Sequence, residues 1–186
     1  MKIEWFTQWR ARQARANSRY QPQLADLPPA LEPYWRHSAP HEYQGIPTDA
    51  FFFARAAEGL MHFFDAVTAS GKACTLPSVA ADSVWHAWLR LDAAGLARFC
   101  QRHFGAAVPH VERSGLGSGA LLNTFAACHA LDCGMPHKPQ LPSLFSLDTR
   151  LGMRGGHGYW LHGGRILYAR TGPTAWDRDG PCRIRN

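Results

Sequence analysis

The segment from Thr48 to Gly71 constrains the fold most, because its apolar residues recur at the spacing of an α-helix. Thr48 is a suitable N-cap, and Gly71 stands where a helix commonly ends on a left-handed glycine. A broad apolar stripe must be buried, so the segment predicts a core helix. On its other face we expect His62 to be a surface partner of Glu58. The stripe consists of Phe53, Ala56, Leu60, Phe63, Phe64 and Val67.

Two more helices are predicted directly downstream, joined by almost no loop. Ser78 can cap the first and Asp92 the second, which Gly105 closes. A fourth helix is predicted from near Ser118 to Gly134. Because Trp85 is predicted to be a core residue, Trp85→Ala should leave a large cavity and lower the free energy of unfolding by about 3 to 5 kcal/mol. The residues predicted for the core are Leu60, Phe63, Phe64 and Trp85.

Near the C-terminus the apolar pattern changes to a period of two. Tyr159 to His162 and Arg165 to Arg170 flank Gly163 and Gly164, which predicts a β-hairpin with a two-residue turn. Together these patterns predict a mainly α fold, a compact bundle of about four to five helices with a small C-terminal β-hairpin.

The length of 186 residues and the 46% hydrophobic content suit one domain with a proper core. We expect a single domain over 1–186. It would consist of an N-terminal helix and an irregular Pro-rich wrap (1–47), a helical core (48–134), and a loop with the hairpin (135–186). Five cysteines without a disulfide-scaffold spacing predict reduced thiols and a cytoplasmic location. No apolar run is long enough to predict a membrane span.

The first segment combines aromatic and basic residues. Trp5, Phe6 and Trp9 lie near one another on the predicted helix, and we expect them to dock onto the domain. A peripheral membrane contact is the less favoured alternative, because the apolar face is short. The formal net charge is +6, which makes nucleic acid a possible partner. The arginines that would serve this contact are Arg10, Arg12, Arg15 and Arg19.

The spacing of several cysteines and histidines is compatible with a zinc site. Cys128, Cys133 and His137 form a C-x4-C-x3-H pattern, and Cys100 with His103 would complete a set of ligands. The spacing is not a standard one, and free cysteine is commonly a small buried hydrophobe, so buried thiols are the favoured interpretation.

The run from Gly115 to Ala120 matches G-x-G-x-x-A but lacks a preceding strand and the distant acidic residue that dinucleotide binding needs. A flexible loop before a helix is the favoured interpretation. Serine-nucleophile elbows, Walker loops, H-E-x-x-H motifs and C-x2-C pairs are absent from the sequence.

Asp82 and His86 are four residues apart on one face of a predicted helix, and Arg90 shares that face. A carboxylate so placed can fix the tautomer of a catalytic or metal-bound histidine, and His110 could join the pair from a loop. The favoured interpretation is a structural polar cluster that ties the helix pair to the loop. A catalytic or metal site made of Asp82, His86 and His110 is the alternative.

These residues also resemble a known family. They resemble the uncharacterised bacterial proteins grouped as glycine-rich domain-containing protein-like. The signature of that family is an acidic residue three positions before a Trp-His pair, followed by Phe-Cys, Phe-Gly and a late histidine. The resemblance covers roughly residues 50–152, implies an all-helical core and names no substrate. A single histidine stands here where bacterial members often show two. The matching residues are Asp82, Trp85, His86, Phe99, Cys100, Phe104, Gly105 and His110.

The favoured functional interpretation is a non-catalytic binding or interaction module for a protein partner or small ligand, because aromatic and basic residues are abundant and no complete catalytic set is visible. A metal- or histidine-dependent enzyme centred on Asp82, His86 and His110 is the first alternative. A nucleic-acid-binding accessory protein is the second. No organic cofactor is predicted, and zinc stays a less favoured possibility.

Overall fold

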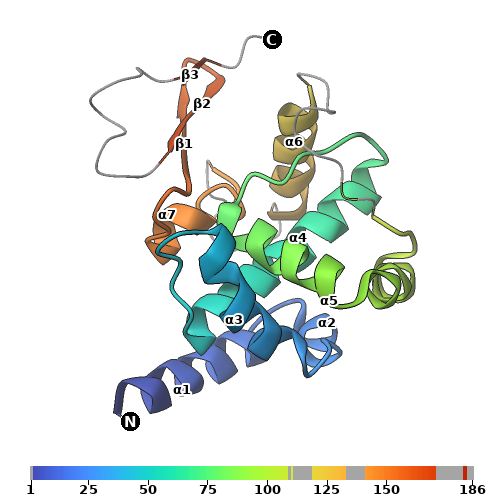
Figure 1. The fold of residues 1–186 in the computed structure, drawn as a ribbon. Helices are drawn as coiled ribbons and strands as arrows, with labels where there is room; N and C mark the ends of the chain where they lie inside the picture. The colour runs from blue at the N-terminus through green and yellow to red at the C-terminus, as the bar shows by residue number, and fades with distance from the viewer. Residues whose placement is uncertain (1, 109, 111–118, 133–140, 171–181, 184–186) are drawn as a thin grey trace. The chain divides into compact units, whose positions relative to one another are not determined.

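The structure is a computed structural model that describes residues 2–108, 110, 119–132, 141–170 and 182–183. These residues form seven α-helices and a small antiparallel sheet near the C-terminus, so the prediction of a mainly α fold with a C-terminal hairpin is confirmed (Figure 1). The chain divides into two compact units, 1–62 with 80–107 and 63–79 with 108–186. No helix in the described part is long and apolar enough to cross a membrane.

The first unit is built only from helices. It contains α1 (Lys2–Ala16), α2 (Gln21–Ala25), α3 (Leu31–Glu42), the first part of α4 (Ala50–Ser70) and nearly all of α5 (Val79–Phe104). The prediction that the Pro-rich segment before α4 is irregular was therefore wrong, since this segment contains α2 and α3.

The prolines of that segment occupy positions that a helix tolerates. Pro22 and Pro33 lie in the first turns of α2 and α3, where a missing N–H costs nothing because these amides have no partner within the helix. Pro40 lies inside α3, in its last turn, where it removes one backbone hydrogen bond to the preceding turn. Packing of the apolar face of α3 then outweighs the weak local preference.

Helix α4 is the predicted core helix, with one change at its start. The carboxylate of Asp49, rather than the hydroxyl of Thr48, is the cap: Asp49 Oδ1 accepts the amide hydrogens of Phe51 and Phe52 at 2.9 and 3.0 Å. Gly71 follows the helix with φ +61°, as predicted. The four predicted core residues are confirmed at no more than 4% exposure each: Leu60, Phe63, Phe64 and Trp85.

His62 does not lie on the surface, which contradicts the sequence-based expectation. It is 5% exposed, and its ring centroid lies 6.1 Å from that of Tyr20. Glu58 pairs instead with Arg55, three residues earlier on α4. The short segment between α1 and α2, which carries Tyr20, covers this face, and the helical pattern of α4 alone could not show it.

Helix α5 contains the predicted junction of two helices that are joined by almost no loop. Asp92 has extended backbone angles (φ −161°, ψ 84°) between two helical segments, and its Oδ1 accepts the amide hydrogen of Gly95 at 2.8 Å. Asp92 therefore caps the second segment, as predicted. Gly105 ends that segment with φ +78°.

Trp35 of α3 lies at the centre of the first unit. It is fully buried, its ring centroid is 5.9 Å from that of Phe52 and 5.2 Å from that of Phe53, and its Nε1 donates to Ser83 Oγ at 2.9 Å. The contact fixes α3 against α4 and α5 within this unit. It thereby sets the position of the C-terminal end of α3, where the candidate site begins.

The aromatic residues of α1 do not dock onto the domain, contrary to expectation. Trp5, Phe6 and Trp9 are 65%, 50% and 43% exposed, whereas Ala11 is buried and packs with Ala50. The small side chain of Ala11 lets α1 approach α4 closely. The large rings lie on the other side of the helix as a result.

The second unit combines helices and strands. After residues 63–79 it contains α6 (Ala120–Asp132), α7 (Leu147–Leu151), and the strands β1 (His157–His162), β2 (Arg165–Arg170) and β3 (Cys182–Arg183) in the order β1-β2-β3. The predicted fourth helix is α6, and its predicted ends at Ser118 and Gly134 lie outside the described residues.

The predicted hairpin is β1 and β2, paired antiparallel with His162 opposite Arg165. Gly163 and Gly164 have φ +56° and +73°, the left-handed values that both central residues of a type I′ turn require. Four buried residues form one hydrophobic cluster of this unit, with an aromatic edge-to-face contact between Phe145 and Tyr159. They are Leu121, Phe145, Tyr159 and Ile166.

The buried carboxylate of Asp148 organises the second unit. Asp148 Oδ1 accepts the Ser78 hydroxyl hydrogen at 2.6 Å, and Oδ2 accepts the amide hydrogens of Val79 and His157 at 2.9 and 2.8 Å. The start of α5 is thus stabilised by a residue 69 positions later. The sequence predicted Ser78 as the cap of this helix, and local sequence does not reveal the contribution of Asp148.

Candidate functional site

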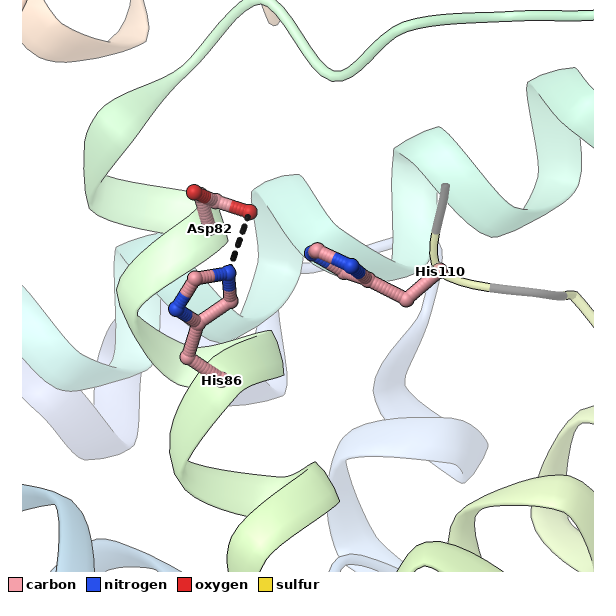
Figure 2. Close-up of side chains that lie close together, drawn as sticks. All are labelled: Asp82, His86 and His110. Atoms are coloured by element: carbon pink, nitrogen blue, oxygen red, sulfur yellow. Dashed lines mark ion pairs between the residues drawn. The ribbon is translucent and has the colours of Figure 1, made fainter. Parts of the chain in front are cut away.

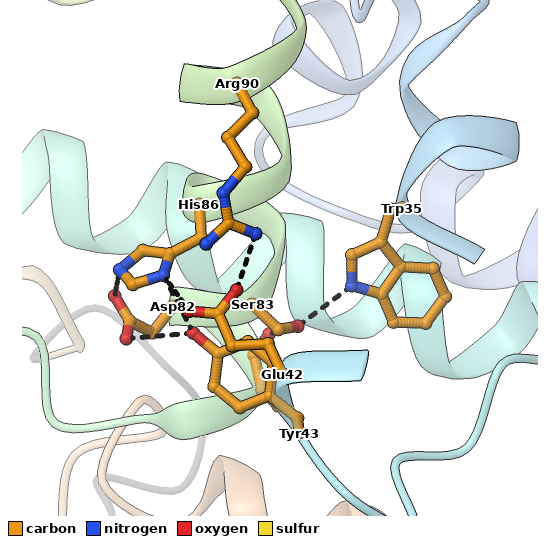
Figure 3. Close-up of polar contacts among 8 residues, drawn as sticks. Trp35, Glu42, Tyr43, Asp82, Ser83, His86 and Arg90 are labelled. Atoms are coloured by element: carbon orange, nitrogen blue, oxygen red, sulfur yellow. Dashed lines mark hydrogen bonds and ion pairs between the residues drawn. The ribbon is translucent and has the colours of Figure 1, made fainter. Parts of the chain in front are cut away.

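A cluster of polar side chains lies in the first unit where the end of α3 meets one face of α5 (Figure 3). Asp82, His86 and Arg90 follow one another at intervals of four residues on α5 and so share that face. Glu42 is the last residue of α3, and Tyr43 is its C-cap. The burial of Trp35 and its bond to Ser83 hold the two helices in this register.

The imidazole of His86 lies between two carboxylates. Its Nδ1 is 2.6 Å from Glu42 Oε1, the distance of a strong charge-assisted hydrogen bond. Its Nε2 faces Asp82 Oδ1 at 3.7 Å, which is longer than a hydrogen bond (Figure 2). The two ring nitrogens therefore have different surroundings, and in the neutral ring we assign the proton to Nδ1, which faces Glu42.

Glu42 is a strong hydrogen-bond acceptor at neutral pH. Its Oε2 accepts a hydrogen bond from Arg90 Nη1 at 2.7 Å. Burial alone would raise the pKa of Glu42, but the hydrogen bonds from Arg90 and His86 outweigh burial and hold the pKa below its ordinary value. The carboxylate consequently stays ionised and fixes the orientation of the His86 ring.

Tyr43 orients the second carboxylate. Its hydroxyl donates to Asp82 Oδ2 at 3.3 Å, and its oxygen lies 3.2 Å from His86 Nδ1. Burial, with the negative charges of Asp82 and Glu42, raises the pKa of Tyr43, so the phenol keeps its proton. The hydroxyl holds one oxygen of Asp82, while the other, Oδ1, faces the imidazole.

The site is open to solvent. The side chains of His86, Asp82 and Glu42 are 26%, 33% and 29% exposed. Half-buried groups can exchange an ion or small molecule with water, yet they are held by enough contacts to keep one geometry. This arrangement can bind a cation between an imidazole nitrogen and a carboxylate oxygen.

The possible metal ligands among the described residues include Asp82, His86 and His110, each of them partly buried (Figure 2). These are the three residues that the sequence singled out. Asp82 and His86 belong to the first unit, and His110 belongs to the second. Each offers one ligand atom, a carboxylate oxygen or a ring nitrogen.

The cysteine-rich zinc candidate is less complete. Cys133 and His137 lie outside the described residues, and Cys100 and Cys128 are buried at 1% and 0% exposure. His103 Nε2 contacts Asp26 Oδ2 at 2.8 Å.

The carboxylate of Asp26 also accepts a hydrogen bond from Arg102 at 2.8 Å. The hydrogen bond from His103, with smaller contributions from Arg102, holds the pKa of Asp26 below its ordinary value. His103 therefore has a place in an ion-pair network that joins α5 to the C-cap of α2.

The remaining sequence candidates have varied surroundings. In the run Gly115 to Ala120, residues 115–118 lie outside the described residues, and Ala120 opens α6. Among the arginines, Arg15 pairs with Glu32 at 2.8 Å. Arg10, Arg12 and Arg19 are exposed.

Sequence reasoning missed Glu42 and Tyr43. Each contacts His86 from more than forty positions away, 44 for Glu42 and 43 for Tyr43, and no motif links the two stretches. Glu42 also ends a helix that the prolines concealed. A carboxylate at a helix C-terminus opposes the helix dipole, and the contacts with Arg90 and His86 offset that cost. If the end of α3 had been predicted, this unfavourable position of a carboxylate would have indicated that Glu42 has a partner elsewhere in the fold.

A family model described as UCP032817-like matches residues 48–172. The matched region contains Asp82, His86 and His110 but not Glu42 or Tyr43. No curated protein and no solved structure matches the chain.

Proposed function

The chain belongs to the UCP032817-like family, and we propose that it is a binding domain for a divalent transition metal ion such as zinc, held by Asp82 and His86. We also propose that the chain is related to the glycine-rich domain-containing protein-like proteins that its sequence resembles. The observation that carries it is the arrangement of the His86 imidazole, with one nitrogen on the carboxylate of Glu42 and the other facing Asp82.

The Glu42 contact is the supporting contact that metal-bound histidines ordinarily have. A histidine ligand almost always donates its second ring N–H to a carboxylate or carbonyl, which fixes the tautomer and makes the ligating nitrogen more basic. With Nδ1–H on Glu42, the lone pair of Nε2 is directed at the space that Asp82 Oδ1 also faces. Asp82 in turn receives the hydroxyl hydrogen of Tyr43 on its other oxygen.

The separation of the two ligand atoms suits a small ion. Zinc lies about 2.0 to 2.2 Å from nitrogen and oxygen ligands, so two ligands of a tetrahedral site are about 3.4 Å apart. The observed 3.7 Å between His86 Nε2 and Asp82 Oδ1 needs a shift of only a few tenths of an ångström. Imidazole and carboxylate together also favour zinc-class ions over calcium or magnesium, which prefer oxygen ligands alone.

A second candidate function is a metal- or histidine-dependent enzyme at the same residues. Asp82 and His86 leave coordination positions to water, and catalytic zinc sites likewise keep a position open for water. The solvent access of His86 and Asp82 favours this candidate. Binding of the ion is common to both functions and is the step that can be tested without a substrate.

The supporting role of Glu42 gives a direct test. Glu42→Gln keeps the shape of the side chain but removes the charge that orients His86, so we expect the Kd for zinc to rise by about 10- to 100-fold. Isothermal titration of the untagged protein with zinc would measure it. Glu58→Gln, at a carboxylate that pairs with Arg55 on α4, is the matched control and should leave the Kd unchanged. Equal zinc affinity in wild type and Glu42→Gln would contradict the assigned role.

A further inference from the structure

The outward face of α1 combines exposed aromatic rings with flanking arginines. Trp5, Phe6 and Trp9 are 65%, 50% and 43% exposed, which is unusual for three large apolar side chains within two turns. On a helical wheel Trp9 lies nearly opposite the buried Ala11. The three rings are therefore on the side of the helix directed away from the core of its unit.

The charge beside these rings is positive. Arg10 and Arg12 are exposed and lie on the two flanks of the aromatic face, at the boundary with the buried side. The helix contains Lys2, Arg10, Arg12 and Arg15 against a single acidic residue, Glu4. An aromatic face bordered by arginines is complementary to a surface that is apolar in its interior and negatively charged outside.

We propose that this face of α1 binds reversibly to anionic phospholipid bilayers, with Trp5, Phe6 and Trp9 inserted at the level of the headgroups. Tryptophan suits that depth, because its ring is apolar and its N–H can reach the wet headgroups. The short aromatic face predicts weak adsorption that depends on anionic lipid. The proposal is independent of the metal site, whose ligands Asp82 and His86 lie on α5.

The ring geometry favours a bilayer over single-stranded nucleic acid. Bases bind by stacking on open aromatic faces. Here Phe6 and Trp9 are stacked on each other, with centroids 6.1 Å apart and planes 23° apart, and the guanidinium of Arg10 lies 5.8 Å from the Phe6 centroid. Their faces are partly covered by these contacts. A ring face that another group already covers cannot hold a stacked base, whereas an exposed ring can enter a lipid interface in any orientation.

The test is flotation of the full chain with vesicles of phosphatidylcholine alone and with added phosphatidylglycerol. We expect binding only to the anionic vesicles and a fall of at least about tenfold in the partition coefficient for Trp5→Ala/Trp9→Ala. Trp160→Ala, which removes a 38% exposed tryptophan on β1, is the matched control and should bind like wild type.

A second arm tests the charge. Arg10→Gln/Arg12→Gln should weaken binding at low salt by about tenfold, whereas Arg98→Gln/Arg150→Gln, on α5 and α7, should leave it nearly unchanged. A single-stranded oligonucleotide is the competing probe. The proposal is overturned if wild type does not float with anionic vesicles, if the two tryptophan replacements leave flotation unchanged, or if the tryptophans serve oligonucleotide binding instead.

Discussion

His86→Gln is expected to abolish zinc binding, with a rise in Kd of at least about 100-fold, because it removes the ligand that Glu42 orients. The side chain is 26% exposed, so we expect the free energy of unfolding without zinc to change by less than about 1 kcal/mol. Titration calorimetry with zinc and urea unfolding in a chelator give the two quantities on the same samples.

The same substitution separates the metal site from a structural polar cluster. If His86 serves only to join Glu42 to Asp82, its loss leaves buried polar partners unsatisfied and costs about 1 to 3 kcal/mol, with no effect on zinc. His162→Gln, at the exposed end of β1, is the matched control for general histidine effects. A destabilised His86→Gln protein with wild-type zinc affinity would refute the metal assignment.

Trp35→Ala is expected to have the largest effect on stability, about 3 to 5 kcal/mol, because it empties the centre of the first unit. The substitution removes the contacts with Phe52 and Phe53 and the hydrogen bond to Ser83. Since these contacts position the end of α3, zinc affinity should fall as well. Chemical denaturation followed by circular dichroism measures the loss.

Two further substitutions give the scale of that effect. Trp35→Phe keeps most of the ring contacts and loses mainly the Nε1 hydrogen bond, so a cost of about 1 to 2 kcal/mol is expected. Trp5→Ala, at a 65% exposed position, should change stability by no more than about 0.5 kcal/mol. Equal costs for Trp35→Ala and Trp5→Ala would contradict the packing described for the first unit.

Elements with a strong local signal were predicted correctly. The apolar period and Gly71 predicted α4, Asp92 predicted the start of the second helical segment of α5, and the glycine pair predicted the hairpin. In each case neighbouring residues decide the structure, through helical burial, a side-chain cap or a left-handed turn. Asp82 and His86 were singled out for the same reason, since a spacing of four places them on one helix face.

Contacts between distant segments were not predictable from one sequence. Helix α3 was missed because prolines lower its local preference, although burial of Trp35 stabilises it. Glu42 and Tyr43 were missed with it, as they follow from where α3 ends. The exposure of Trp9 was also missed, because the helix could present either its aromatic residues or its alanines to the core, and Ala11 allows the closer approach.

The most direct test of the metal site is a crystal structure of the protein grown with zinc, with anomalous diffraction measured on both sides of the zinc absorption edge. We expect one strong anomalous peak about 2.0 to 2.1 Å from His86 Nε2, with Asp82 Oδ1 as a second ligand. The hydrogen bond from His86 Nδ1 to Glu42 should persist. Well-ordered His86 and Asp82 side chains without an anomalous peak between them, in crystals that contain zinc, would contradict the proposal.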